Sequence, residues 1–104
     1  SLTGMIRIEA PPIDAKVPLH DPIELRWAAA GKKPVYEIAV STIPFQFLND
    51  KQIEWQPAGS AGSFRFVPGP TARPGSWIYW QVRLLDEGKQ VQTTSEIAAF
   101  RLSE

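Results

Sequence analysis

The sequence predicts an all-β fold, an antiparallel β-sandwich, on three observations. Short segments in which apolar and polar residues alternate recur through the 104 residues, and alternation at a period of two is typical of strands with one buried face. Residues that form turns, mainly Pro, Gly, Asn and Asp, separate these segments at roughly ten-residue spacing. No segment has the apolar period of an amphipathic helix of three turns, which a parallel sheet would need between its strands.

The strongest predicted strand is Trp77 to Asp86, with the sequence W-I-Y-W-Q-V-R-L-L-D. Alternation places two sets of side chains on opposite faces of this strand. The inward set is Ile78, Trp80, Val82 and Leu84, and the outward set is Trp77, Tyr79, Gln81 and Arg83. Turn-forming pairs, Pro74-Gly75 and Glu87-Gly88, bound the segment. We expect this strand to lie in the centre of its sheet, with the other strands assembled against it.

The first strand is predicted from Met5 to Ala10, where Ile6 and Ile8 share one face. Pro11-Pro12 ends it, because proline has no amide N–H to donate to a neighbouring strand. A strand that ends at proline is expected at the edge of a sheet. Residues 13–21 show no alternation and are expected to form an irregular connection.

Two further strands follow in the first half. Alternation is clear from residue 23 to 27, where Ile23, Leu25 and Trp27 share a face. It is clear again from residue 36 to 41, where the apolar positions are Tyr36, Ile38 and Val40. After residue 41 the pattern stops, and Pro44 favours one helical turn because proline is accepted at the first helical position. Phe45, Phe47 and Leu48 are the side chains expected to anchor that turn.

The remaining strands are predicted in the second half. Residues 53–56 can form a short strand around Trp55, and residues 63–67 form a strand with Phe64 and Phe66 inward. Residues 90–94 and 98–102 complete the set. Since Trp27 and Trp80 both occupy inward positions of strong strands, we expect both indoles to be buried and close together across the two sheets.

Composition excludes several classes of function. Eleven basic and eleven acidic residues give a net charge of zero, so the chain has no global attraction for nucleic acid or anionic membranes. No stretch of about 20 apolar residues is present to insert into a membrane. There is no cysteine and only one histidine, His20, which excludes disulfides, thiolate metal sites and multi-histidine metal sites. We therefore expect no metal and no cofactor.

The sequence also lacks the patterns of a catalytic site. No serine lies in a nucleophile elbow, and the carboxylates are scattered through turns and outward strand positions rather than paired. Gly59 and Gly62 are not followed by the Lys-Ser/Thr of a phosphate-binding loop. His20, with Asp21 and Asp14 nearby, reads as a solvated residue of a proline-rich loop. No catalytic residue is predicted, and the chain is not expected to be an enzyme by itself.

Four segments together resemble a known family. They are Trp27, Y-E-I-A-V-S at 36–41, P-G-S-W-I-Y-W-Q-V-R-L-L-D-E-G at 74–88, and S-E-I-A-A-F-R-L at 95–102. This order resembles the fibronectin type III domain, in the form found in bacterial cell-envelope and secreted proteins. The resemblance covers residues 5–103 and leaves residues 1–4 as a flexible N-terminal segment or a remnant of cloning. It implies a seven-stranded, immunoglobulin-like sandwich.

The resemblance also implies a function. Such a domain is expected to be extracytoplasmic, that is periplasmic, on the cell surface or secreted. It is expected to act as a non-catalytic spacer or protein-interaction module, with neighbouring domains of a longer parent chain or another protein as partners. One alternative is an accessory fragment of an enzyme whose active site lies elsewhere in the parent.

A second alternative is a carbohydrate-binding module, and it depends on the outward face of the central strand. Trp77 and Tyr79 share that face with Gln81 and Arg83, and Trp55 lies in a nearby segment. Two large aromatic side chains on one outward face can stack on a sugar or receive a partner protein. These five residues are the candidate contacts for a partner or a glycan. The competing interpretation is that residues 42–62 fold over Trp77 and Tyr79 and cover them.

Overall fold

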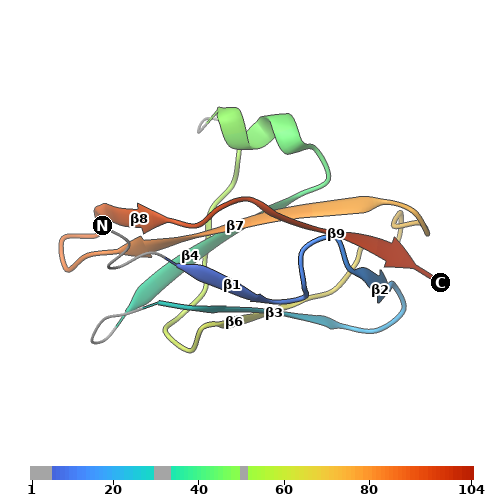
Figure 1. Ribbon diagram of the computed structural model, residues 1–104. Coiled ribbons are helices and arrows are strands. Elements are labelled where there is room, and N and C mark those ends of the chain that lie inside the picture. The colour runs from blue at the N-terminus through green and yellow to red at the C-terminus, as the bar shows by residue number, and fades with distance from the viewer. Residues whose placement is uncertain (1–5, 30–33, 50–51) are drawn as a thin grey trace.

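The computed structural model describes residues 6–29, 34–49 and 52–104, which form two packed β-sheets (Figure 1). The strands are β1 (Arg7–Ala10), β2 (Lys16–Pro18), β3 (Ile23–Ala28), β4 (Val35–Ser41), β5 (Gln56–Pro57), β6 (Ser63–Phe66), β7 (Trp77–Leu85), β8 (Val91–Thr94) and β9 (Ala98–Ser103). The smaller sheet has the order β1-β3-β6. The larger has the order β2-β9-β7-β4-β5, with β8 also paired to β7. The expected flexible segment 1–4 lies outside the described residues.

Strand β7 is central in the larger sheet, as its sequence predicted. On one side β4 pairs antiparallel with it from Tyr79 to Leu85. On the other side β9 pairs with its first half and β8 with its second half. The alternation is realised along the whole strand: the four inward side chains are buried and the outward ones are half-buried. The larger sheet therefore has an inner face toward the core and an outer face that carries Trp77 and Tyr79.

The expected count of seven strands is wrong, because the described residues contain nine. The strand that no predicted segment covers comes from 13–21, which we expected to be irregular. There the chain crosses from the smaller to the larger sheet after Pro11-Pro12 and continues as β2, in parallel pairing with β9. A segment of three residues is too short to show alternation, so sequence periodicity could not indicate this strand.

The two strands predicted over 90–94 and 98–102 are present as β8 and β9, and they lie one after the other along the same side of β7. Strands β8 and β9 both pair with β7 and are interrupted at Ser95, which is buried. The Val82 N–H donates to the Ser95 hydroxyl over 3.0 Å, and the Ser95 N–H donates to the Val82 carbonyl over 2.7 Å. The hydroxyl itself donates to the Glu96 carbonyl at 2.8 Å. Ser95 thus satisfies buried backbone groups where the regular ladder stops.

Replacing Ser95 with Ala is expected to lower the free energy of unfolding by about 1–3 kcal/mol, because the Val82 N–H would be left buried without a partner. Urea denaturation measures the change. Ser60→Ala, in an exposed loop, is the control and should change stability by less than about 0.5 kcal/mol. Equal stability of the two variants would contradict the role of this hydroxyl.

The segment between β4 and β5 differs from expectation in two respects. Pro44 does begin a short helix, the 3-10 helix η1 (Pro44–Leu48), but Leu48 is 80% exposed and does not anchor it. The side chain of Phe45 lies outside the described residues. Trp55 precedes β5 rather than lying within a strand over 53–56, and only Gln56 and Pro57 pair with β4. In the described part of the chain, no helix has the length and apolar character to cross a bilayer.

The core lies between the inner faces of the two sheets, and its centre is aromatic. Trp27 of β3 and Trp80 of β7 are buried, with ring centroids 6.2 Å apart, which confirms the predicted contact across the sheets. Tyr36 of β4 packs edge-on against Trp27 with centroids 5.4 Å apart. Phe64 and Phe66 of β6 also pack against this core, as their alternation predicted.

Trp27→Ala or Trp80→Ala is expected to destabilise the domain by roughly 3–5 kcal/mol, because each removes a buried ring and leaves a cavity between the sheets. Chemical denaturation monitored by circular dichroism measures the loss. Leu48→Ala, at a position that is 80% exposed, is the control. A loss below about 1 kcal/mol for either Trp variant would contradict the central place of this contact.

Burial also affects the ionisation of Tyr36. Loss of hydration raises the pKa of this phenol above its ordinary value of 10.0, and the neighbouring Trp27 opposes the rise in part. A raised pKa in the folded state means that folding favours the protonated form. The stability is therefore fully present below pH 10 and is lost as the pH rises through the folded-state pKa.

We expect the urea midpoint of the native sequence to fall more steeply above pH 10 than that of Tyr36→Phe, which has no phenol to ionise. Midpoints measured from pH 8 to 11 for both proteins test this. Parallel pH profiles would show that ionisation of Tyr36 is not coupled to folding.

Candidate functional site

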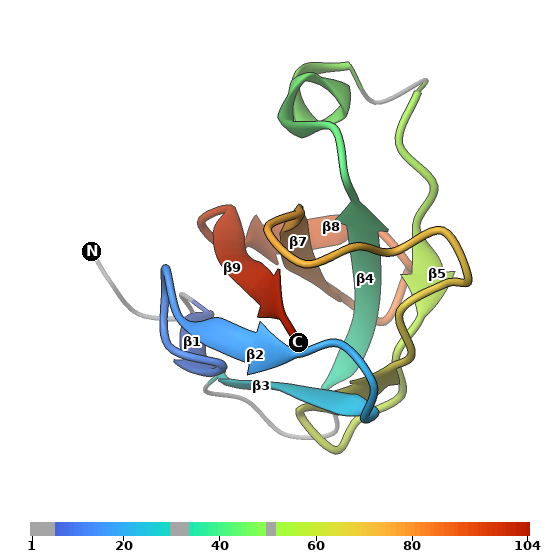
Figure 2. The same cartoon turned by 90° about the vertical axis from the view of Figure 1, so that its right-hand side faces the viewer.

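The outer face of the larger sheet brings the predicted site residues into defined rows. Strand register places Trp77 beside Arg101, Tyr79 beside Ala99 and Ser41, and Arg83 beside Glu37. Helix η1 stands on the outer side of this sheet, above β4 and β7 (Figures 1 and 2).

Arg83 is held by partners within the chain. Its guanidinium makes an ion pair with Glu37, with Nη2 and Oε1 2.6 Å apart, and its Nε also donates to Oε1 over 2.7 Å. Both side chains are about one-quarter exposed. The ring of Trp55 lies over the same guanidinium, with its centroid 4.2 Å from Cζ. Trp55 and Arg83 are thus brought together, in an arrangement that closes this part of the outer face.

Gln81 is also occupied within the chain. Its side-chain amide donates to the Ser95 carbonyl over 2.8 Å, next to the break between β8 and β9. Of the five predicted contact residues, Gln81, Arg83 and Trp55 therefore make internal contacts that support the sheet. These internal contacts hold the three side chains in place and make them less available to a ligand than their outward positions suggest.

Trp77 and Tyr79 differ from these three residues. Both rings are half-buried, and among the described residues no ring contact joins either of them to Trp55. Tyr79 lies between the small register partners Ser41 and Ala99. The ring of Trp77 has the guanidinium of Arg101 beside it, with Cζ 5.6 Å from the ring centroid. Trp55, the tryptophan of the segment 42–62, thus lies over Arg83 and not over these two rings.

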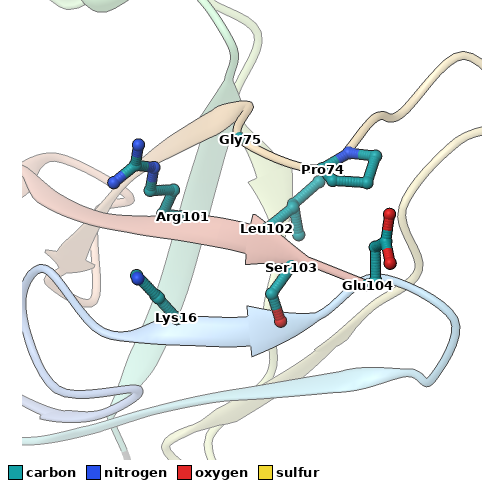
Figure 3. Close-up of a pocket in the computed structure, with 7 residues that line it drawn as sticks. All are labelled: Lys16, Pro74, Gly75, Arg101, Leu102, Ser103 and Glu104. Carbon is teal, nitrogen blue, oxygen red and sulfur yellow. The ribbon is translucent and has the colours of Figure 1, made fainter.

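A hollow of about 290 Å³ is lined in part by Arg101, the register partner of Trp77 (Figure 3). Its lining residues are Lys16, Pro74, Gly75, Arg101, Leu102, Ser103 and Glu104. Lys16 of β2 is the register partner of Arg101 in β9, so two cationic residues of adjacent strands lie side by side in the lining. Sequence analysis missed both residues. The outward phase of Arg101 was visible, but nothing local indicated that Lys16 would pair beside it.

A second hollow, of about 530 Å³, lies where the β2–β3 connection meets the segment after β6. It contains His20, Asp21 and Arg65, and each of these residues is exposed. In the described residues no group of three or more His, Asp or Glu side chains is arranged to hold a metal ion. His20 therefore lies in an open, solvated surround.

Comparison with solved structures identifies the architecture. The fibronectin(III)-like modules of CbhA from Clostridium thermocellum superpose with a TM-score of 0.63 at 12% sequence identity, over 95% of this chain and 96% of that one. The chain has a fibronectin type III-like fold. At this low identity the likeness establishes the fold and leaves the function open. No protein-family model matches the sequence, and no curated protein matches it.

Two longer chains contain a region similar to this fibronectin type III-like domain. Pectate lyase PelI from Erwinia chrysanthemi, in complex with tetragalacturonic acid, matches 93% of this chain with 28% of its own length, at 13% identity and a TM-score of 0.57. The β-1,2-glucanase from Parabacteroides distasonis matches 98% of this chain with 14% of its own, at 15% identity and a TM-score of 0.56. In both, the similar region is a minor part of a larger protein.

The cation–π contact between Trp55 and Arg83 should be measurable in this domain as a coupling free energy. A double-mutant cycle with Trp55→Ala and Arg83→Met is expected to give about 1 kcal/mol, because the ring and guanidinium are in part withdrawn from water. The same cycle between Trp55→Ala and Arg101→Met should be additive, because the guanidinium of Arg101 lies beside Trp77 and not beside Trp55. Additivity in both cycles would contradict a stabilising contact at Arg83.

Proposed function

We propose that this domain is a non-catalytic module of a longer, extracytoplasmic protein of the bacterial envelope or secreted type, where it spaces or connects neighbouring domains. The observation that carries the proposal is the end-to-end match with a fibronectin(III)-like module. The matches to 28% and 14% of two longer chains support it, since they place a similar domain inside larger proteins.

The dimensions of the domain suit a spacer. Its principal extents are 40, 26 and 23 Å. Strand β1 begins toward one end of the long axis and β9 finishes at the other (Figure 1). A chain that passes through such a domain gains length in one direction, and the two sheets keep that length rigid. The internal contacts of Gln81, Arg83 and Trp55 fit this role, because they stabilise the sheet without a ligand.

A replacement experiment in the parent protein tests the proposal. Residues 5–103 are exchanged for an unrelated fibronectin type III-like domain of equal length, and the activity or binding of the parent is measured. A spacer predicts full function after the exchange, and complete removal of the domain should impair it. Loss of function after the exchange would overturn the spacer role and favour a contact made by the surface of this domain.

Glycan binding is the second candidate, and a specific observation favours it. Trp77 and Tyr79 remain half-buried on the outer face, while the other three predicted contact residues are engaged internally. Half-exposed aromatic rings are suited to stacking on sugars. Two of the similar chains are named as polysaccharide-degrading enzymes, which supports both this candidate and the role of an accessory domain in an enzyme.

A further inference from the structure

One end of the outer face carries two neighbouring cations that have no acidic partner within the described residues. Lys16 and Arg101 are register partners in the parallel strands β2 and β9. The ion pairs of the described side chains join Arg7 to Glu9, Arg26 to Glu24 and Arg83 to Glu37, and leave both cations out. Adjacent strands lie about 4.8 Å apart, and like charges carried side by side on them repel each other. An anion bound between them would remove this repulsion.

Arg83 provides a comparison on the same face. It also points outward from the larger sheet, but its register partner is Glu37, which neutralises it at 2.6 Å. The sheet therefore pairs one outward arginine with an acid and pairs the other with a lysine. Glu104 is the acidic residue in the lining of the hollow. Its carboxylate lies at the other end of the hollow from the charged tips of Lys16 and Arg101 (Figure 3).

The hollow beside these cations has a fixed wall. The turn at Pro74-Gly75 is tied to β9 by two backbone bonds, from the Gly75 N–H to the Leu102 carbonyl and from the Leu102 N–H to the Ser76 carbonyl, both 2.8 Å. Gly75 has a φ of +89°, which a residue with a Cβ rarely adopts. The volume of about 290 Å³ is near the lower end of the range of small-ligand sites. This part of the surface is preformed.

The aromatic ring of Trp77 extends the site on the other side of Arg101. In register, Lys16, Arg101 and Trp77 form one row across three adjacent strands, and two strand spacings give it a length of roughly 10 Å. A guanidinium and an ammonium bind carboxylates, and an indole face stacks on the apolar face of a sugar ring. A ligand that uses the whole row therefore has both carboxylates and sugar rings.

A peptide fits this edge less well. Addition of a strand would use the free edge of β2, but β2 has only three residues and ends at Pro18, which has no N–H to donate. We propose that the row formed by Lys16, Arg101 and Trp77 binds an oligosaccharide of uronic acids. This inference rests on the glycan-binding candidate and specifies its ligand and its residues.

Calorimetric titration of the folded chain with a tetramer of galacturonic acid tests the inference, with neutral cellotetraose and poly-L-glutamate as the comparison ligands. We expect the acidic tetramer to bind, with an affinity that falls as salt is added. The double variant Lys16→Gln/Arg101→Gln should lose roughly tenfold to a hundredfold in affinity. Arg65→Gln, which removes one positive charge from β6 on the other sheet, should bind as the native sequence does.

The outcomes separate this inference from the function on which it rests. Binding of cellotetraose as tight as that of the acidic tetramer, unchanged in the double variant, would overturn the uronic-acid specificity and leave glycan binding in place. Binding of neither sugar would overturn both. Equal binding of poly-L-glutamate, lost in the same variants, would overturn the sugar as ligand. Thermal unfolding of each variant is the control for folding. Lys16, Arg65 and Arg101 are all exposed, so we expect each variant to unfold near the temperature of the native sequence.

Discussion

The contact between Trp27 and Trp80 is the interaction on which the rest of the domain depends. Each indole comes from a different sheet, and their centroids lie 6.2 Å apart at the centre of the core. Burying an aromatic side chain of this size contributes roughly 4–6 kcal/mol, comparable with the whole stability of a small domain. The inward position of Trp80 also forces Trp77 and Tyr79 outward, because neighbouring residues of a strand face opposite sides. The core contact thus determines which residues the outer face presents.

The outer face has one region whose side chains are engaged within the domain and another whose side chains are open to a ligand. At one end Arg83 is enclosed by Glu37 and Trp55, and Gln81 is bonded to the backbone at Ser95. These polar side chains stabilise a sheet in which one side of β7 is paired first with β9 and then with β8. At the other end Arg101 and Lys16 lie beside Trp77 with no acid in register. Glu37 neutralises Arg83, whereas no acid neutralises Lys16 and Arg101 among the described ion pairs. This difference makes the second region the candidate binding surface.

Ser95 shows how a break in strand pairing can be accommodated in a small sandwich. A strand that stops pairing leaves backbone groups without partners, and buried groups of this kind are costly. Here one hydroxyl and one amide of the same residue satisfy both backbone groups of Val82. The chain can then resume pairing as β9, which carries Arg101 to the outer face and Leu102 to the core. The position of Arg101 in the candidate site therefore depends on the hydrogen bonds between Ser95 and Val82.

The sequence alone determined the fold class and the core, because burial on one face of a strand imposes a period of two that local reading detects. It identified β7 as central, the inward positions of Trp27 and Trp80, and the outward positions of Trp77, Tyr79, Gln81 and Arg83. Only the tertiary structure decided which outward residues are engaged. The Glu37–Arg83 pair, the position of Trp55 and the pairing of Lys16 with Arg101 join segments distant along the chain. Strand register sets such pairings, and no local pattern encodes it when one strand has only three residues.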